Sequence, residues 1–360
     1  IIDHLDYLKD LGITGLYLCP IFEATTNHKY DTTDYFEIDR HFGDKEVFAT
    51  LVEEAHKRGI KIMLDAVFNH IGDQSAQWQD VLKNGEKSPY KDWFHIQEFP
   101  ITEDKLKNAR ELPYHTFAFA SYMPKLNTAN PEVKDYLLSV ATYWIENFDI
   151  DAWRLDVANE IDHQFWKDFR KAVLAKKPDL YILGEIWHTS QPWLQGDEFH
   201  AVMNYPLSES IKDYFLRQHK KTEQFISEIN SQSMYYKQQI SEVMFNLLDS
   251  HDTERILTTA KGNVQHVKAA LTFLYLQKGT PCIYYGTELA LIGGPDPDCR
   301  RVMPWDRVSE DNDMLNFMKK LIKVRKEVAS MIQHGSYCLQ EVKPDVLALS
   351  WNYQGKEVQA

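Results

Sequence analysis

Residues 131–157 read Pro-Glu-Val-Lys-Asp-Tyr-Leu-Leu-Ser-Val-Ala-Thr-Tyr-Trp-Ile-Glu-Asn-Phe-Asp-Ile-Asp-Ala-Trp-Arg-Leu-Asp-Val. The first eighteen residues have the spacing of an amphipathic helix, and the last eight form a largely apolar run of strand length. They predict a helix over 131–148 followed by a strand over 150–157. A strand that is apolar on both faces is typical of a parallel sheet covered by helices. This stretch therefore indicates an α/β protein.

The same order of helix and then strand recurs along the chain. Helices are predicted over 2–11, 44–58, 163–177, 191–199, 208–230, 264–278 and 311–326, and strands over 13–21, 60–68, 180–187, 201–206, 243–248 and 281–285. With residues 131–157 this makes seven strands and eight helices, and a helix comes first. A closed eight-stranded barrel needs one more strand before Ile1. We predict a (β/α)8 TIM barrel whose first strand is missing, with an open doubly wound sheet as the alternative.

Two segments depart from this repeat. Residues 71–130 form an aromatic-rich insertion after the third barrel strand, too long for a loop without structure of its own. After Gln333 the hydrophobic period becomes two, which predicts the start of an antiparallel β domain. The predicted domains are a barrel in two parts (1–70 and 131–332), an inserted subdomain B (71–130) and a truncated C-terminal β domain (333–360).

The composition excludes several classes of protein. The 360 residues are 44% hydrophobic and 26% charged, values typical of a globular chain with a sizeable core. The net charge of −13 argues against a nucleic-acid partner, and the longest apolar stretches fall short of the ~20 residues of a membrane span. Four scattered cysteines indicate reduced thiols in a cytoplasmic protein. The 13% content of aromatic residues is a weak indication of a carbohydrate ligand.

Acidic side chains gather at the carboxyl ends of four predicted strands, where barrel enzymes carry their functional residues. Glycoside cleavage with retention needs a carboxylate nucleophile and a carboxylic acid about 5–5.5 Å apart. Adjacent strands lie about 4.8 Å apart, so Asp156 and Glu185 on neighbouring strands can meet this need. The four runs are Asp65-Ala-Val-Phe-Asn-His70, Trp153-Arg-Leu-Asp156, Gly184-Glu-Ile-Trp187 and Asp249-Ser-His-Asp252.

Neighbouring residues indicate which carboxyl has which role. Arg154 precedes Asp156 by two residues on the same strand face, so we expect its cation to lower the pKa of Asp156, as a nucleophile needs. Glu185 has no adjacent base and is flanked by apolar side chains, which favours it as the acid. His251, beside Asp252, would supply hydrogen-bond donors to sugar hydroxyls.

Each of these residues taken singly has a more ordinary interpretation. Asp156 alone would more often cap a helix, and Arg154 alone would form a plain ion pair. His70 alone would be a satisfied buried imidazole, and Trp187 alone would lie in the core. The combination across four ordered strands favours a catalytic site.

These runs resemble the four signature regions of the α-amylase family, here residues 65–70, 153–160, 184–188 and 248–252. A fifth run, Met123-Pro-Lys-Leu-Asn127, resembles the marker of the neopullulanase, cyclomaltodextrinase and maltogenic amylase group. The resemblance extends from Gly15 to about Lys326. It implies a retaining glycoside hydrolase that cleaves α-1,4-glucosidic bonds in cyclodextrins, pullulan and starch-derived maltooligosaccharides, with some transglycosylation.

The resemblance also implies roles for individual residues. Asp156 would be the nucleophile, Glu185 the general acid/base and Asp252 a third carboxylate that binds sugar hydroxyls. Asp65 and Asn69 would organise the site, and Glu160 would influence transfer to sugar acceptors. The substrate-binding residues would be Tyr30, His70, Phe117, Arg154, Trp187, His251, Asp296 and Arg300.

The implied cofactors and partners are few. No metal ligands are predicted and no cofactor is required, while the family allows a structural calcium ion bound by a stretch before Ile1. The parent protein would be a homodimer formed through an absent N-terminal domain. Two other interpretations remain, a catalytically silent accessory barrel and a metal-dependent barrel hydrolase. The three carboxylates disfavour the first, and the lack of a spaced His pair disfavours the second.

Overall fold

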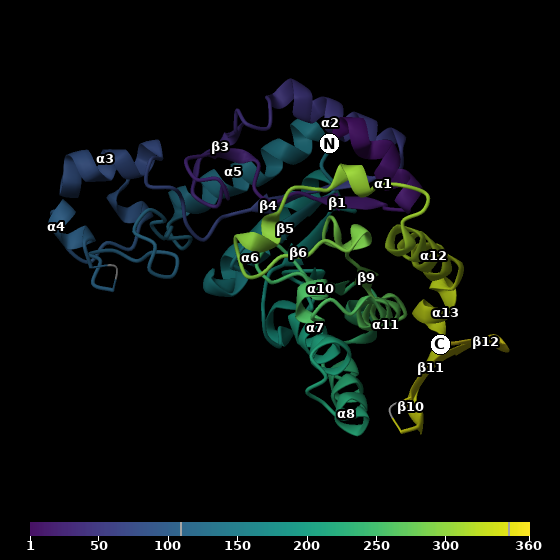
Figure 1. The fold of residues 1–360 in the computed structure, drawn as a ribbon. Coiled ribbons are helices and arrows are strands. Elements are labelled where there is room, and N and C mark those ends of the chain that lie inside the picture. Colours follow the sequence, from purple (N-terminus) through teal and green to yellow (C-terminus); the bar gives the residue numbers. More distant parts are fainter. Residues whose placement is uncertain (109, 345) are drawn as a thin grey trace. The chain divides into compact units, whose positions relative to one another are not determined.

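The structure, a computed structural model, describes residues 1–108, 110–344 and 346–360, the side chain of Glu103 excepted. The chain forms two compact units, whose helices and strands are shown in Figure 1. The division into four domains made from the sequence stays a prediction. Unit 1 consists of Ile1–Lys9, Ile13–Glu185 and Gln195–Phe199, and unit 2 of Asp10–Gly12, Ile186–Leu194 and His200–Ala360.

Parallel strands in the order β1, β4, β5, β6 form the centre of unit 1. They span Gly15–Tyr17, Lys61–Ala66, Ala152–Leu155 and Tyr181–Gly184. Ala66 pairs in register with Leu155, and Leu155 pairs with Gly184. Because these strands end in register, Asp156 and Glu185, which follow β5 and β6, leave the sheet side by side.

Helices alternate with these strands, as predicted. They are α1 (Leu5–Leu11), α2 (Lys45–Lys57), α5 (Pro131–Phe148) and α6 (His163–Lys176). The side chains of Asp44, Asn130 and Asp162 accept hydrogen bonds from first-turn amides of the last three helices. Such a cap stabilises a helix by about 1 kcal/mol, so these three starts are set by local sequence. Trp144 of α5 is fully buried, and its indole nitrogen donates to Tyr35 O at 2.9 Å.

An antiparallel hairpin precedes α2. It pairs β2 (Phe22–Ala24) with β3 (Thr32–Ile38). Residues 25–31 connect the two strands and carry Tyr30. The strand predicted over 13–21 is shorter than expected, because β1 covers only Gly15–Tyr17.

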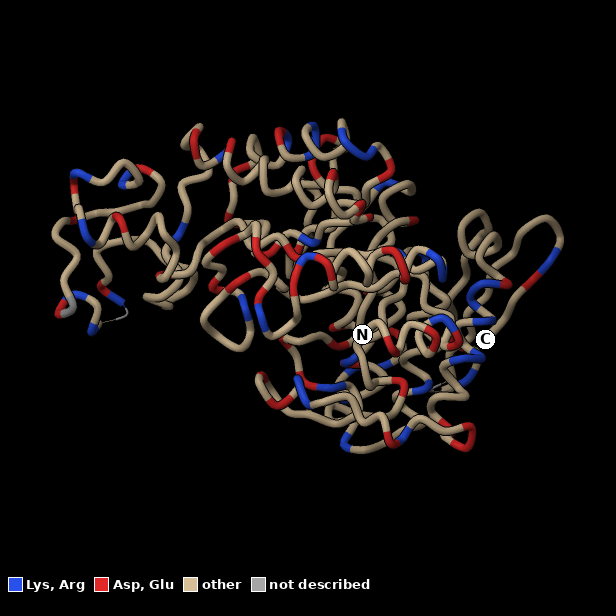
Figure 2. Tube along the Cα trace, turned by 90° about the horizontal axis from the view of Figure 1, so that it is seen from above, with Lys and Arg blue, Asp and Glu red and all other residues tan. Residues whose placement is uncertain are grey.

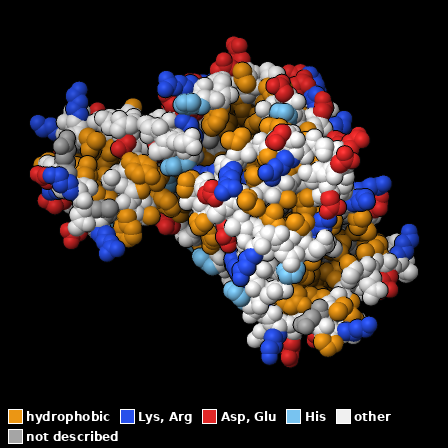
Figure 3. All heavy atoms as spheres, in the orientation of Figure 1, with side chains coloured by type: hydrophobic (Ala, Val, Ile, Leu, Met, Phe, Trp, Pro, Cys, Tyr) orange, Lys and Arg blue, Asp and Glu red, His pale blue; other side chains and the backbone are white. Residues whose placement is uncertain are grey.

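The insertion over 71–130 has an aromatic core of its own. It contains α3 (Ala76–Asn84) and α4 (Glu103–Leu106). The ring centroid of Trp78 lies 4.7 Å from that of Phe94 and 4.5 Å from that of Tyr114, and all three side chains are buried. Hydrophobic side chains also gather on the surface of the lobe that holds α3 and α4 (Figure 3). These aromatic contacts explain why so long an insertion is ordered.

The alternation of strands and helices continues in unit 2. Its barrel-type elements are β7 (Ala201–Val202), α7 (Tyr205–Ile211), α8 (Thr222–Ser233), α9 (Gln238–Ser241), β8 (Phe245–Asn246), α10 (Ile256–Thr259), α11 (Val264–Tyr275), β9 (Thr280–Pro281), α12 (Asp313–Glu327) and α13 (Ala329–His334). Strands β8 and β9 are parallel, and Met203 forms a parallel bridge to Phe245.

Two helices predicted for this part of the chain are wrong. The single helix over 208–230 is divided into α7, a π-helical turn at Lys212–Leu216 and α8. The chain turns at Gln218, whose φ is 56°, inside the run Arg217-Gln-His-Lys-Lys221, which has no apolar side chain to bury. The helix over 191–199 is a short 3-10 helix at Gln191–Trp193.

The period of two after Gln333 correctly predicts antiparallel strands. They are β10 (Ser336–Lys343), β11 (Val346–Tyr353) and β12 (Lys356–Gln359) in the order β10, β11, β12. Gln354 and Gly355 both have positive φ values, 49° and 76°, as a tight turn between two strands requires. The indole nitrogen of Trp351 donates to Leu276 O at 2.9 Å, which ties the sheet to the end of α11 within unit 2.

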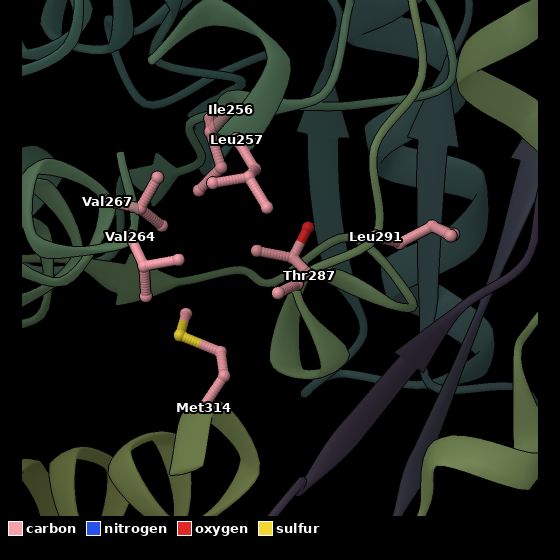
Figure 4. A pocket seen from close by; sticks show the side chains of 8 residues that line it. Ile256, Leu257, Val264, Val267, Thr287, Leu291 and Met314 are labelled. Carbon is pink, nitrogen blue, oxygen red and sulfur yellow. The ribbon is translucent and has the colours of Figure 1, made fainter. Parts of the chain in front are cut away.

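A small cavity in unit 2 is a packing gap rather than a binding site. Its volume is about 10 Å³, at the lower limit for one water molecule, and its lining is apolar. Figure 4 shows the lining side chains, which belong to Ile256, Leu257, Val264, Val267, Thr287, Ala290, Leu291 and Met314.

Charged residues of both signs are interspersed along the trace of each unit (Figure 2). Large single-sign fields of the kind that attract nucleic acid are therefore not expected. Within the described part of the chain, no helix has the length and apolar character needed to cross a bilayer.

Candidate active site

Asp156 and Glu185 stand at the ends of neighbouring strands. Asp156 N donates to Ala66 O at 3.1 Å, and Glu185 N donates to Leu155 O at 2.9 Å, so both backbones continue the sheet. The Glu185 carboxyl accepts a hydrogen bond from Val157 N at 2.9 Å. The two residues are only 5% and 7% exposed. The structure therefore brings together the two carboxyls predicted to break the glycosidic bond.

Val157, directly after Asp156, has an unusual backbone conformation. Its φ of 46° and ψ of 43° lie in the left-handed region, where a β-branched residue is a genuine outlier. Such strain costs about 1–3 kcal/mol and persists only where the surroundings enforce it. Here the strained residue aims its amide at the Glu185 carboxyl. The backbone thus positions the acid with respect to the nucleophile.

Arg154 connects three carboxyls through one guanidinium group. It is fully buried, and its Nη1 donates to Asp65 Oδ1 at 2.9 Å and to Asp156 Oδ1 at 2.6 Å. Its Nη2 forms an ion pair with Glu185 Oε1 at 2.9 Å. The prediction that Asp65 and Arg154 lie in the site with the two carboxyls is consistent with this geometry.

The pKa expected for Asp156 is wrong in direction. Burial raises the pKa of the Asp156 carboxyl well above its ordinary value, although the Arg154 cation opposes this effect. The negative charges of Glu185 and Asp65 add to the increase in the pKa of Asp156. One guanidinium cannot neutralise three buried carboxylates, so the cluster retains a proton more readily than separate carboxyls would.

Two tyrosines complete the cluster. The hydroxyl groups of Tyr17 and Tyr30 both donate to Asp65 Oδ2, at 2.7 Å and 3.0 Å. Tyr30 is a predicted site residue, whereas the sequence analysis missed Tyr17. Its position at the carboxyl end of β1, the same edge that bears Asp156, was the available signal.

His70 lies in the site as a neutral imidazole. Its Nε2 is 3.0 Å from Tyr30 O, and its ring stacks on Phe117 with centroids 5.0 Å apart. Asn69 Nδ2 lies 3.3 Å from His70 Nδ1. Burial lowers the pKa of His70 from 6.5 to about 3, so its ring is uncharged at neutral pH. The three predicted residues His70, Phe117 and Asn69 are thus brought together with Tyr30.

The free energy of unfolding should depend on pH through His70. Between pH 6.5 and about 3 the unfolded chain protonates this side chain and the folded protein does not, so stability is lost as the pH falls. We expect the difference in unfolding free energy between wild type and His70→Gln to shrink by up to about 1.4 kcal/mol per pH unit in this window. Chemical denaturation at pH 7, 6, 5 and 4 measures it. A difference that stays constant would show that His70 titrates normally.

The other predicted residues lie in unit 2, where four of them form one group. His251 Nε2 is 3.1 Å from Asp252 Oδ2, and Arg300 Nε donates to His251 O at 3.0 Å. The same Arg300 nitrogen is 2.7 Å from Asp296 Oδ1. The placement of this group opposite Asp156 stays a prediction.

Trp187 is the remaining predicted residue of unit 2. Its ring is 48% exposed and stacks on the buried ring of Tyr205, with centroids 3.8 Å apart and an angle of 5° between the planes. A flat, exposed indole held in this way can accept the apolar face of a sugar ring.

A polar groove lies within unit 1, lined almost entirely by residues of the insertion. Its volume is about 840 Å³, and it lies between the insertion and the 3-10 helix Ala158–Glu160 that follows Asp156. Lys125 and Glu160 form an ion pair of 3.1 Å on its wall, and Phe119 on its rim is 65% exposed. Polar side chains with an exposed aromatic ring are the surroundings that an oligosaccharide requires.

A model of the alpha-amylase catalytic domain matches residues 1–335 of this chain. The chain belongs to the alpha-amylase family. It is 56% identical over 352 residues to the intracellular maltogenic amylase of Bacillus subtilis, covering 97% of this chain and 58% of that protein. It is 56% identical over 331 residues to the cyclomaltodextrinase of Geobacillus thermopakistaniensis, covering 92% of this chain and 55% of that protein. A solved cyclomaltodextrinase structure, 49% identical, matches with a TM-score of 0.94 over 100% of this chain and 61% of its own.

Membership of the alpha-amylase family confirms the predicted (β/α)8 barrel fold. It also confirms the group of relatives that the sequence motifs indicated. The chain spans less than two thirds of the length of each of these relatives. In the described residues, no group of three or more His, Cys, Asp or Glu side chains could hold a metal ion. The structural calcium ion that the resemblance allows stays a prediction.

Proposed function

We propose that the protein carrying this chain is a retaining glycoside hydrolase acting on α-1,4-glucosidic bonds. The observation that carries the proposal is the pairing of Asp156 and Glu185 around Arg154 at the ends of adjacent strands. A catalytically silent barrel has no need of two buried carboxyls joined to one cation, because burying them costs stability. The geometry therefore supports catalysis over an accessory role.

The reaction would proceed in two displacements. In the first, an Asp156 oxygen attacks the anomeric carbon while Glu185 donates its proton to the leaving glycosidic oxygen. This attack forms a glycosyl ester on Asp156. In the second, the Glu185 carboxylate takes a proton from water, whose oxygen attacks the anomeric carbon and releases Asp156. Arg154 keeps a positive charge beside both carboxyls throughout. A sugar hydroxyl in place of water gives transglycosylation.

The proposed substrates are cyclodextrins, pullulan and starch-derived maltooligosaccharides. The name cyclomaltodextrinase, carried by a relative that is 56% identical and by a structure with a TM-score of 0.94, supports the first of these. The groove of about 840 Å³ in the insertion gives room for several sugar rings. The name of the intracellular relative supports a location in the cytoplasm. The homodimer rests on the sequence resemblance alone and stays a prediction.

The anomeric form of the first product tests the reaction type. The protein is incubated separately with β-cyclodextrin, pullulan and soluble starch, and the new reducing ends are followed by proton NMR within the first minutes. We expect the α-anomer to appear first, because two inversions restore the original configuration. Appearance of the β-anomer first would rule out the double displacement, and absence of cleavage of all three would rule out the function.

A further inference from the structure

We propose that Lys29 is a positioning residue of this active site, acting through Tyr30. Its buried ammonium would hold the loop 25–31 in the one conformation that places the Tyr30 hydroxyl on Asp65. This inference rests on the function proposed above and adds to it a residue to which the sequence assigned no role.

The ammonium group links the start of the loop to the residue that follows β3. Lys29 is 4% exposed, and its Nζ lies 2.7 Å from Asp39 Oδ2 and donates to Ala24 O at 3.3 Å. Asp39, which follows β3, is 3% exposed and also accepts a hydrogen bond from Ala24 N at 3.3 Å. Ala24 is the last residue of β2. Lys29, Asp39 and Ala24 therefore form a closed set of hydrogen bonds, which connects the end of β2 to the residue after β3.

The backbone of Lys29 is strained. Its φ of 66° lies in the left-handed region, which is uncommon for a residue with a side chain. Such a conformation persists only when the surroundings enforce it. The Asp39 carboxylate contributes to that enforcement, because it fixes the far end of the Lys29 side chain. The Asp31 carboxylate also holds the loop, because it accepts hydrogen bonds from the amides of Thr25 and Thr26. Release of the side chain would let the backbone relax and move the next residue, Tyr30.

Tyr30 carries the effect of Lys29 into the catalytic cluster. Its hydroxyl donates to Asp65 Oδ2 at 3.0 Å, and its carbonyl oxygen lies 3.0 Å from His70 Nε2. Its ring centroid lies 6.0 Å from the guanidinium carbon of Arg154, within the range of a cation–π contact. A shift of the Tyr30 backbone would therefore disturb the groups that hold Arg154 against Asp156.

Stability alone does not account for this ion pair. A buried pair costs desolvation on both sides, and an apolar pair of similar volume is often as stable. We therefore attribute the charged pair to its effect on the backbone of Lys29, which orients Tyr30. This distinction makes the proposal testable, because the charge can be removed from both partners together.

The test compares Lys29→Met with Lys177→Met. Lys177 lies 3.1 Å from Asp151 Oδ1, and Asp151 is a 7% exposed carboxylate that precedes β5, at the strand end opposite to the catalytic cluster. Each variant removes one lysine from a buried aspartate, so both should lower the unfolding temperature. Asp39 keeps His41 at 2.6 Å, and Asp151 keeps His56 at 2.8 Å and Lys61 at 3.5 Å. We expect kcat/KM for β-cyclodextrin to fall at least tenfold in Lys29→Met and less than twofold in Lys177→Met. The kinetics are measured where circular dichroism shows each variant fully folded.

The double variant Lys29→Met/Asp39→Asn separates positioning from stability. It removes both charges, so the unfolding temperature should recover toward that of wild type, while kcat/KM stays at least tenfold low. Recovery of kcat/KM in the double variant, or an equal loss in Lys177→Met, would overturn the proposal. If the proposed function itself is wrong, the wild-type protein will not cleave the substrates, and this result is seen before any variant is compared.

Discussion

Replacing Asp156 with Asn is expected to abolish turnover of α-1,4-glucans, with kcat reduced on the order of 10⁴-fold or more. An amide has nearly the shape of the carboxylate but cannot form the glycosyl ester on which the double displacement depends. The amide oxygen of the Asp156→Asn variant can still accept the hydrogen bond that Arg154 Nη1 gives to the carboxylate, so the cluster should keep its geometry. The assay is the release of reducing ends from β-cyclodextrin.

The same variant should not be less stable at neutral pH. Because the folded protein raises the pKa of Asp156, the folded state binds a proton more readily than the unfolded chain. The stability associated with this group is therefore present below its ordinary pKa of 3.8 and is lost as the pH rises through the folded value. An uncharged amide in place of this carboxyl avoids the loss, so the unfolding temperature at pH 7 should equal or exceed that of wild type.

Asp151→Asn is the matched control for Asp156→Asn. Asp151 is a buried aspartate at the other end of the same strand, where it binds His56 at 2.8 Å and Lys177 at 3.1 Å. Its amide variant should lose stability and keep kcat. Turnover by Asp156→Asn at more than a few per cent of the wild-type rate would remove Asp156 as the nucleophile.

Replacing Glu185 with Gln should remove most of the activity on α-1,4-glucans. A glutamine cannot donate a proton to the leaving oxygen, and general acid catalysis contributes about 10²–10⁴-fold. The loss in kcat/KM, which reports the first displacement, should be much smaller for an aryl α-maltoside with an acidic leaving group, because that group departs without a proton. Steady-state kinetics with both substrates measure kcat/KM separately from kcat, which also contains the second displacement that Glu185 assists.

Glu198→Gln is the matched control for Glu185→Gln. Glu198 is 2% exposed and is paired with His163 at 2.9 Å. It is thus a buried glutamate of unit 1 whose ion-pair partner is a histidine of α6. Its variant should keep the wild-type kcat/KM on both substrates. Equal losses of Glu185→Gln on the cyclodextrin and on the aryl glycoside would exclude Glu185 as the proton donor.

Helices were predicted well where short-range signals determine them. The helix over 131–148 coincides with α5, and the start of α6 at His163 coincides with the predicted start. Their apolar spacing and their capping residues lie within a few positions of each other, so no distant contact is needed to define them. The prediction of a single helix over 208–230 was wrong for a related reason. A polar run that only tertiary packing could have kept helical was interrupted at Gln218.

Site residues were predicted where a motif carries them. Asp156, Glu185 and Arg154 lie together because their strands are adjacent and end in register, which the order of strands in the sequence already indicates. Tyr17 was missed, because it acts through a partner that is distant in sequence. Tyr17 contacts Asp65, 48 positions away, and no motif of local spacing marks such a pair.

The amino-acid sequence by itself determined the fold class, the family and the identity of the carboxyls at the strand ends, because these depend on periodicity and on ordered motifs. The tertiary structure alone decided the electrostatics of the site. One guanidinium faces three carboxyls from three strands, and so burial raises the pKa of Asp156 where its neighbour Arg154 alone would lower it. Charge interactions depend on distance and burial in space, and residues remote in sequence contribute to them as strongly as the nearest neighbour does.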